Sequence, residues 1–205
     1  MENKSFKSIS IVGVDGTGKS STISLLQDKI GIDKSCVQYM GARLWETELM
    51  QKYTEKLPTK NPFVVVVYMY AYIREMYHRY NKYKGDDRIV IFDRYAFEHG
   101  LFLKEDAKGF KGHLMASILQ FAFVRLYPRP SLSVYLTCPI EVTLQRKSDI
   151  KTHKEIEAVK KGKDILDKYY STYPGVVVMD TSKKDQESIV EEIFHIVDAN
   201  LLGNK

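Results

Sequence analysis

The sequence predicts an α/β fold in which helices flank both faces of a five-stranded parallel β-sheet. Two observations carry this prediction. Short, continuous apolar runs rich in β-branched residues recur along the 205-residue chain, as expected of strands that are buried on both faces. Segments with helical patterns separate these runs, and this alternating order is typical of a three-layer fold built on a parallel sheet.

Each predicted element follows from its local pattern. The apolar runs place the strands at residues 8–12, 36–40, 88–92, 132–136 and 176–179. The helical patterns place helices at 18–30, 140–147, 154–170 and 186–201. The segment 61–84 carries contrary signals, because the β-branched run at 64–67 favours a strand whereas Asn61 followed by Pro62 favours a helix start. No helix breaker follows, so we expect one long helix there.

Composition limits the classes of function. Hydrophobic residues make up 44% of the chain and charged residues 28%, as in ordinary globular proteins. We expect a single domain over 1–205 with a small helical lid at about 146–162. The apolar runs are too short to span a membrane and no signal-peptide pattern begins the chain, so we expect a cytoplasmic protein with reduced cysteines. The net charge of +5 weakly favours anionic partners.

The strongest motif is GVDGTGKS at residues 13–20, which follows the first strand and opens the first helix. It matches the phosphate-binding P-loop, whose glycines let backbone N–H groups point at phosphates while the helix N-terminus adds positive charge. Lys19 would bind the β- and γ-phosphates of ATP, and the Ser20 hydroxyl would bind Mg²⁺. The predicted ATP-binding residues are Gly13, Asp15, Gly16, Thr17, Gly18, Lys19, Ser20 and Ser21.

Two further features indicate an acceptor site beside this loop. Asp15 is an acid among phosphate-binding residues, and a hydroxyl or amine of the acceptor is a natural partner for it. Asp93, Arg94 and Tyr95 follow the third strand, and ligands of such sheets bind beyond the carboxyl ends of strands. Asp93 could bind Mg²⁺ or accept a proton, and Arg94 could clamp an anionic acceptor. A loop acid exposed to solvent and a strand-end salt bridge are the alternative interpretations.

GVDGTGKSS, the triplet Asp93-Arg94-Tyr95 and the run VYLTCPIEVTLQRK together resemble the thymidylate kinase family over nearly the whole chain. The resemblance implies the P-loop NTPase fold, transfer of phosphate from ATP with Mg²⁺ to dTMP, giving dTDP, and a possible homodimer. It implies that Lys19, Asp93, Arg94 and Arg146 are catalytic and that Ser20 and Asp93 bind the metal. The substrate-binding residues would be Asp15, Arg43, Arg74, Arg94 and Tyr95.

Several alternatives stay open from the sequence. The acceptor could be another nucleotide, a nucleoside or a sugar, because the lid beyond Arg146 is rich in lysine and only Arg43 stands where the family has an arginine after the second strand. A GTP-dependent switch would need an Asn-Lys-x-Asp motif, but Ser182 occupies the Asn position. A nucleic-acid-stimulated ATPase is suggested only by the basic charge and the aromatic residues. We therefore expect a small nucleotide as the partner, and neither nucleic acid nor membrane.

Overall fold

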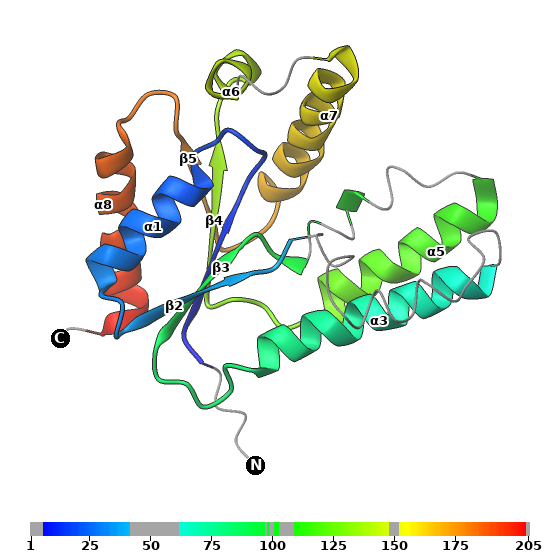
Figure 1. The fold of residues 1–205 in the computed structure, drawn as a ribbon, viewed down its shortest axis with the longest axis horizontal. Helices are drawn as coiled ribbons and strands as arrows, with labels where there is room; N and C mark the ends of the chain where they lie inside the picture. The colour runs from blue at the N-terminus through cyan, green and yellow to red at the C-terminus, as the bar shows by residue number, and fades with distance from the viewer. Residues whose placement is uncertain are drawn as a thin grey trace. The chain divides into compact units, whose positions relative to one another are not determined.

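Five parallel strands form one sheet in the order β2-β3-β1-β4-β5 (Figure 1). The computed structural model describes residues 6–41, 62–96, 98, 101–102, 109–147 and 152–203. The strands are β1 (Ser8–Val12), β2 (Ser35–Tyr39), β3 (Ile89–Asp93), β4 (Leu132–Thr137) and β5 (Val176–Asp180). The predicted α/β fold with a five-stranded parallel sheet is therefore confirmed.

The first strand ends where predicted, and the other four differ from the prediction by one residue because backbone pairing, and not side-chain polarity, decides where a strand stops. The third strand was predicted to end at residue 92, yet Asp93 continues the ladder, opposite Ile11 of β1 and Tyr39 of β2. The second strand begins at Ser35 and ends at Tyr39, one residue earlier than predicted, because Ser35 pairs with Ile89. The fourth and fifth strands each extend one residue further, and their last residues pair with each other.

Helices cover both faces of the sheet, as the alternation of side chains along β4 shows. Val134 points into the core shared with α1 (Lys19–Ile30) and α8 (Gln186–Val197). Its neighbour Tyr135 points to the opposite face, because successive strand residues alternate, and there its ring stacks on Tyr170 of α7 (His153–Tyr170) with centroids 4.9 Å apart. The sheet is thus the middle of three layers.

The core between the sheet and the α1/α8 layer is aliphatic. It contains Ile9, Ile11, Ile23, Leu26, Ile30, Ile89, Ile91, Leu132, Val134, Leu136, Met179, Ile189, Val190, Ile193, Val197 and Leu201. The last of these lies in a π-helical turn, η3 (Asp198–Leu202), where the sequence predicted that α8 would continue to residue 201. This packing holds α1, which begins at the end of the phosphate loop, against the sheet.

Local signals account for the starts of the helices near the carboxyl edge of the sheet. The short helix α6 (Ile140–Arg146) begins after Pro139, because the proline ring disfavours a helical backbone in the residue that precedes it. At α7, the Thr152 side chain accepts a hydrogen bond from the Glu155 N–H, and Glu155 in turn accepts one from the Thr152 N–H, at 2.9 Å. Asp185 caps α8 by accepting from the Ser188 N–H at 2.7 Å.

The chain forms two compact units. The first comprises Met1–Tyr39, Gly85–Tyr95 and Arg129–Lys205, and holds the sheet with α1, α6, α7 and α8. The second comprises Met40–Lys84 and Ala96–Pro128. The single domain with a lid at 146–162 stays a prediction, and residues 148–151 of that lid lie outside the described part of the chain.

The second unit is helical in its described residues. The helix predicted over 61–84 is confirmed as α3 (Pro62–Asn81), so the β-branched run within it does not form a strand. Two elements not predicted from the sequence follow, α5 (Gly109–Phe121) and the π-helical turn η2 (Ala122–Leu126). The rings of Tyr72 and Phe123 meet edge to face with centroids 5.1 Å apart, and the Tyr127 hydroxyl donates to the Met76 carbonyl at 2.7 Å. Among the described residues, no helix has the length and hydropathy needed to cross a lipid bilayer.

Two adjacent leucines of α1 test the assignment of the core. Leu26 is fully buried, whereas Leu25 is 39% exposed. We expect Leu26→Ala to lower the free energy of unfolding by about 2–5 kcal/mol, since it leaves a cavity between α1 and the sheet. Leu25→Ala, the matched control, should change it by less than about 0.5 kcal/mol. Urea unfolding of both variants measures the difference, and equal losses would contradict the assignment.

Candidate active site

Three glycines shape the loop between β1 and α1. Gly13, Gly16 and Gly18 have φ angles of 147°, 90° and 87°, values that residues with side chains rarely adopt. A β-carbon on Gly13 would overlap the Leu136 carbonyl oxygen of β4, so the loop can leave the sheet here only because position 13 has no side chain. Such backbone angles are suited to a phosphate-binding nest, in which successive backbone N–H groups point at an anion.

The side chain of Lys19 is buried against the phosphate loop. Its side chain is only 7% exposed, and its Nζ donates to the Val14 carbonyl at 2.7 Å and to Asp15 Oδ1 at 3.4 Å. The Thr17 hydroxyl donates to the same Val14 carbonyl at 2.9 Å. The ammonium therefore lies within the ring of the loop, where it can exchange these acceptors for phosphate oxygens.

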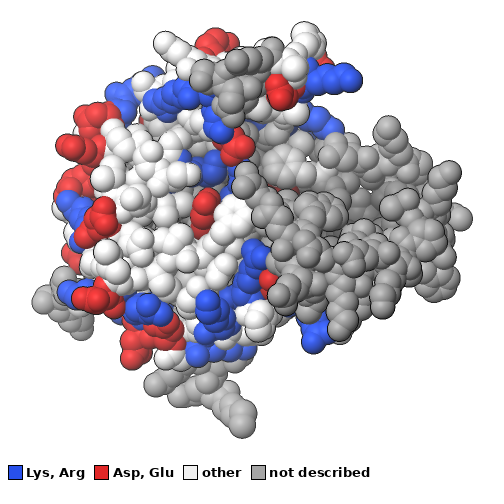
Figure 2. All heavy atoms as spheres, viewed as in Figure 1, with Lys and Arg blue, Asp and Glu red and all other residues white. Residues whose placement is uncertain are grey.

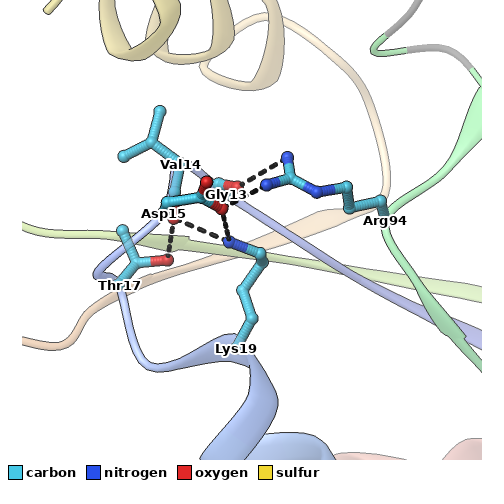
Figure 3. A network of polar contacts seen from close by, with 6 residues as sticks. All are labelled: Gly13, Val14, Asp15, Thr17, Lys19 and Arg94. Atoms are coloured by element: carbon cyan, nitrogen blue, oxygen red, sulfur yellow. Dashed lines mark hydrogen bonds and ion pairs between the residues drawn. The ribbon is translucent and has the colours of Figure 1, made fainter. Parts of the chain in front are cut away.

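Asp15 joins the loop to the third strand. Its Oδ1 accepts from Lys19 and forms a close ion pair with Nη2 of Arg94, and Figure 3 shows the two cationic side chains reaching it from different elements. Burial by itself would raise the pKa of Asp15, but the charges of Arg94, Lys19 and Lys147 outweigh it and hold that pKa below its usual value. Asp15 is therefore ionised at neutral pH and, with a side chain 57% exposed, can still accept a hydrogen bond from a ligand.

Arg94 reaches the loop because of a backbone turn at the end of β3. Its φ of 67° lies in the left-handed region, and among the described residues no other non-glycine residue has a positive φ. Such a conformation costs roughly 1–3 kcal/mol and often occurs at functional sites. The Arg94 N–H donates to the Ile11 carbonyl at 3.0 Å, which holds the turn, and Nη1 lies 3.5 Å from the Gly13 carbonyl.

Asp93 lies beside the phosphate loop, as predicted, because β3 pairs with β1. It stands opposite Ile11, two residues before Gly13. Partial burial raises the pKa of Asp93, and the charges of Lys19 and Arg94 offset only part of this effect. The described residues contain no group of three or more His, Cys, Asp or Glu side chains able to hold a metal ion. Asp93 and the exposed residue Ser20 are oxygen-bearing groups of the kind that bind hard cations.

The two basic residues that end α6 point to different places. Arg146 donates from Nη1 to the Thr181 hydroxyl at 3.1 Å and from Nη2 to the Thr181 carbonyl at 2.8 Å, just after β5. Lys147 instead lies against the phosphate loop, with its Cγ 3.2 Å from where a β-carbon on Gly16 would stand. Of the two, only Arg146 is predicted from the sequence to be a site residue.

A polar network at the end of β4 was not predicted. Asp167 of α7 accepts from the Tyr135 hydroxyl at 2.5 Å and from Thr137 at 3.2 Å, and it forms a close ion pair with Lys163. Burial by itself would raise the pKa of Asp167, but the hydrogen bonds from Lys163 and Tyr135 contribute to an opposite effect that is larger. The pKa of Asp167 is therefore below its usual value. The only signal in the sequence was the spacing of Lys163 and Asp167, four residues apart on a predicted helix.

The remaining predicted residues have different surroundings. Ser21 is exposed on the first turn of α1, next to Ser20. Tyr95 is only 1% exposed, and its ring packs against Phe92 with centroids 5.2 Å apart. Arg74 has an exposed side chain on α3 of the second unit, so it is not among the residues that the first unit brings together. Arg43 lies outside the described residues.

A parallel sheet with the order found here, a glycine-rich loop from its central strand into a helix and a lysine inside that loop define a P-loop NTPase fold. Comparison with known proteins identifies the family. The family model described as thymidylate kinase matches residues 11–193. The chain belongs to the thymidylate kinase family and is a kinase.

Individual relatives agree with this assignment. The chain is 28% identical over 202 residues to "Probable thymidylate kinase 1" of Saccharolobus solfataricus, and the match covers 95% of this chain and 98% of that protein. The thymidylate kinase structure from Candida albicans superposes with a TM-score of 0.66 at 19% identity, over 95% of this chain and 92% of the other. A deoxyadenosine kinase structure from M. mycoides gives a TM-score of 0.58 at 16% identity, over 94% and 98%. The last two show likeness of fold.

The two carboxylates of the site should affect stability in opposite ways. Because burial raises the pKa of Asp93 in the folded state, its ionised form opposes folding, so we expect Asp93→Asn to raise the free energy of unfolding at pH 7. This gain should shrink as the pH falls through the raised pKa and vanish below the usual value of 3.8. Urea unfolding between pH 3 and pH 8, without nucleotide or metal, measures it.

Asp15→Asn is the matched comparison. The pKa of Asp15 is lowered by folding, so its ionised form stabilises the fold above pH 3.8 and this contribution is lost as the pH falls through the lowered pKa. We expect Asp15→Asn to lower the free energy of unfolding at pH 7 and to approach the unsubstituted protein in acid. A loss of stability at pH 7 in Asp93→Asn as well would show that the charges of Lys19 and Arg94 outweigh the effect of burial at Asp93.

Proposed function

We propose that the chain transfers the γ-phosphate of ATP to dTMP in the presence of Mg²⁺. The observation that carries the proposal is the Asp15–Arg94 ion pair, which joins the phosphate loop to the residue that follows Asp93. The residues that would bind the donor and acceptor phosphates thus lie at one edge of the sheet. Family membership and the name of the Saccharolobus solfataricus relative support dTMP as the acceptor.

The residues of the first unit suit a transfer between two phosphates. Lys19 and the loop N–H groups would hold the β- and γ-phosphates, and Arg94 would bind the acceptor phosphate by exchanging Asp15 for it. An acceptor phosphate oxygen forms the new bond to the γ-phosphorus, and the bond from that phosphorus to the β–γ bridging oxygen breaks to release ADP. No general base is needed, because the attacking oxygen is already ionised.

Ser20 and Asp93 are the residues that would hold Mg²⁺, which supplies positive charge between the phosphates. A hydroxyl and a carboxylate are the hard oxygen ligands that this ion prefers. Once released from Arg94, Asp15 is free to accept a hydrogen bond from a sugar hydroxyl of the acceptor. Arg74 and Arg43 remain proposed contacts of the acceptor, and Arg146 a proposed contact of the nucleotide.

On the described part of the face drawn in Figure 2, Asp and Glu side chains lie among the Lys and Arg side chains. A nucleotide as the partner is supported by membership of the family and not by surface charge.

The acceptor is tested by measuring ADP release from ATP and Mg²⁺ with dTMP, dUMP, other monophosphates, nucleosides and sugars. We expect the highest rate with dTMP. Lys19→Ala should reduce that rate by about a hundredfold or more, because it removes the positive charge that stabilises the transferring phosphate. Activity with a nucleoside or sugar in place of dTMP would contradict the acceptor while leaving the roles at the phosphate loop intact.

We further propose that the chain forms a homodimer through α5. Four large apolar side chains recur three or four residues apart along this helix, so they share one face. They are Phe110, Leu114, Ile118 and Phe121, and each is at least half exposed. An exposed apolar face of this kind is typical of a surface that another protein covers.

Ile118→Glu places a charge in the middle of that face. We expect it to convert the dimer to a monomer, as measured by light scattering during size-exclusion chromatography. Glu187→Gln, a change at an exposed residue of α8, should leave the oligomeric state unchanged. A dimer that persists in Ile118→Glu would show that α5 is not the interface.

A further inference from the structure

The last turn of α6 lies directly on the phosphate loop because Gly16 has no side chain. A β-carbon at Gly16 would stand 2.9 Å from the Thr143 carbonyl oxygen and 3.2 Å from Cγ of Lys147. The first of these distances is shorter than real β-carbons tolerate. The stem of Lys147 and the backbone of α6 thus occupy the space that a side chain at position 16 would need.

Lys147 is positioned by the end of its helix. Its N–H donates to the Thr143 carbonyl at 3.1 Å, which closes the last turn of α6. Its Cγ lies beside Gly16, and its charge acts on Asp15 together with those of Arg94 and Lys19. The ammonium of Lys147 is therefore close enough to influence the same carboxylate as the two cations already described.

The neighbouring Arg146 has a different role in this arrangement. Both of its described contacts are to Thr181, a residue that is only 2% exposed and whose N–H is itself bonded to the Thr137 carbonyl at 2.8 Å. The guanidinium is thus tied to the segment between β5 and α8. Moving it onto the phosphate loop would break two hydrogen bonds, whereas Lys147 is already there.

We propose that Lys147, and not Arg146, is the α6 residue that binds the γ-phosphate during transfer, and that Arg146 positions the segment after β5. The inference rests on the proposed function, since it requires an ATP phosphate in the loop. A lysine ammonium on a flexible stem suits this task, because it can follow the phosphoryl group as it moves from donor to acceptor. It also adds a cation to Lys19 and Arg94, and such charges stabilise the negative charge spread over the transferring phosphoryl group.

The test compares the affinities for ATP and ADP, each with Mg²⁺ and without acceptor, by isothermal titration calorimetry. Because only ATP carries a γ-phosphate, we expect Lys147→Met to weaken ATP binding roughly tenfold or more while changing ADP binding little. Lys147→Arg should recover most of that loss. Arg146→Met should weaken both nucleotides alike, and Lys34→Met, which removes an exposed lysine of the first unit, should weaken neither.

Two results would overturn the inference. One is an unchanged ratio of ATP to ADP affinity in Lys147→Met, and the other is a selective loss of ATP binding in Arg146→Met. Either result would leave the proposed function standing as long as the unsubstituted protein binds ATP and transfers its phosphate. If the unsubstituted protein binds neither nucleotide, the proposed function itself fails, and the role of Lys147 fails with it.

Discussion

The parallel pairing of β1 with β3 is the constraint on which the site depends. It sets Asp93 opposite Ile11, so the residues that follow β3 emerge beside the phosphate loop. The left-handed turn at Arg94 then aims its guanidinium at Asp15. If another strand separated β1 from β3, Asp93 and Arg94 would lie nearly 5 Å further from the phosphate loop, because that is the spacing between neighbouring strands.

The two carboxylates at this edge differ because their surroundings differ. Asp15 is surrounded by cations that outweigh the effect of its burial, whereas Asp93 is buried with less compensation. Paired acids whose pKa values are pushed apart generally take different roles. Here the more acidic group, Asp15, balances the charges of Lys19 and Arg94, and the less acidic Asp93 is the one proposed as a metal ligand. The Asp15 carboxylate thereby offsets the positive charges that gather at the phosphate loop.

The carboxyl ends of β4 and β5 hold the helices that follow them. Asp167 ties α7 to Tyr135 and Thr137 of β4, and Arg146 ties the end of α6 to Thr181. These contacts involve side chains that bear no recognisable motif, yet they determine which residues of α6 face the phosphate loop. The rigid sheet thus positions the more distant basic side chains as well as the loop.

The sequence by itself determined the fold class, the strands to within one residue and the phosphate loop, because buried strands and anion-binding loops each require a local pattern of residues. It did not indicate α5, whose apolar face is exposed and whose segment contains Gly109 and Gly112, which are poor helix formers. Only the tertiary structure decided which of two adjacent basic residues, Arg146 or Lys147, lies on the loop. That choice depends on helix packing against Gly16 and on the acceptors at Thr181, contacts between segments far apart in the chain that no local pattern encodes.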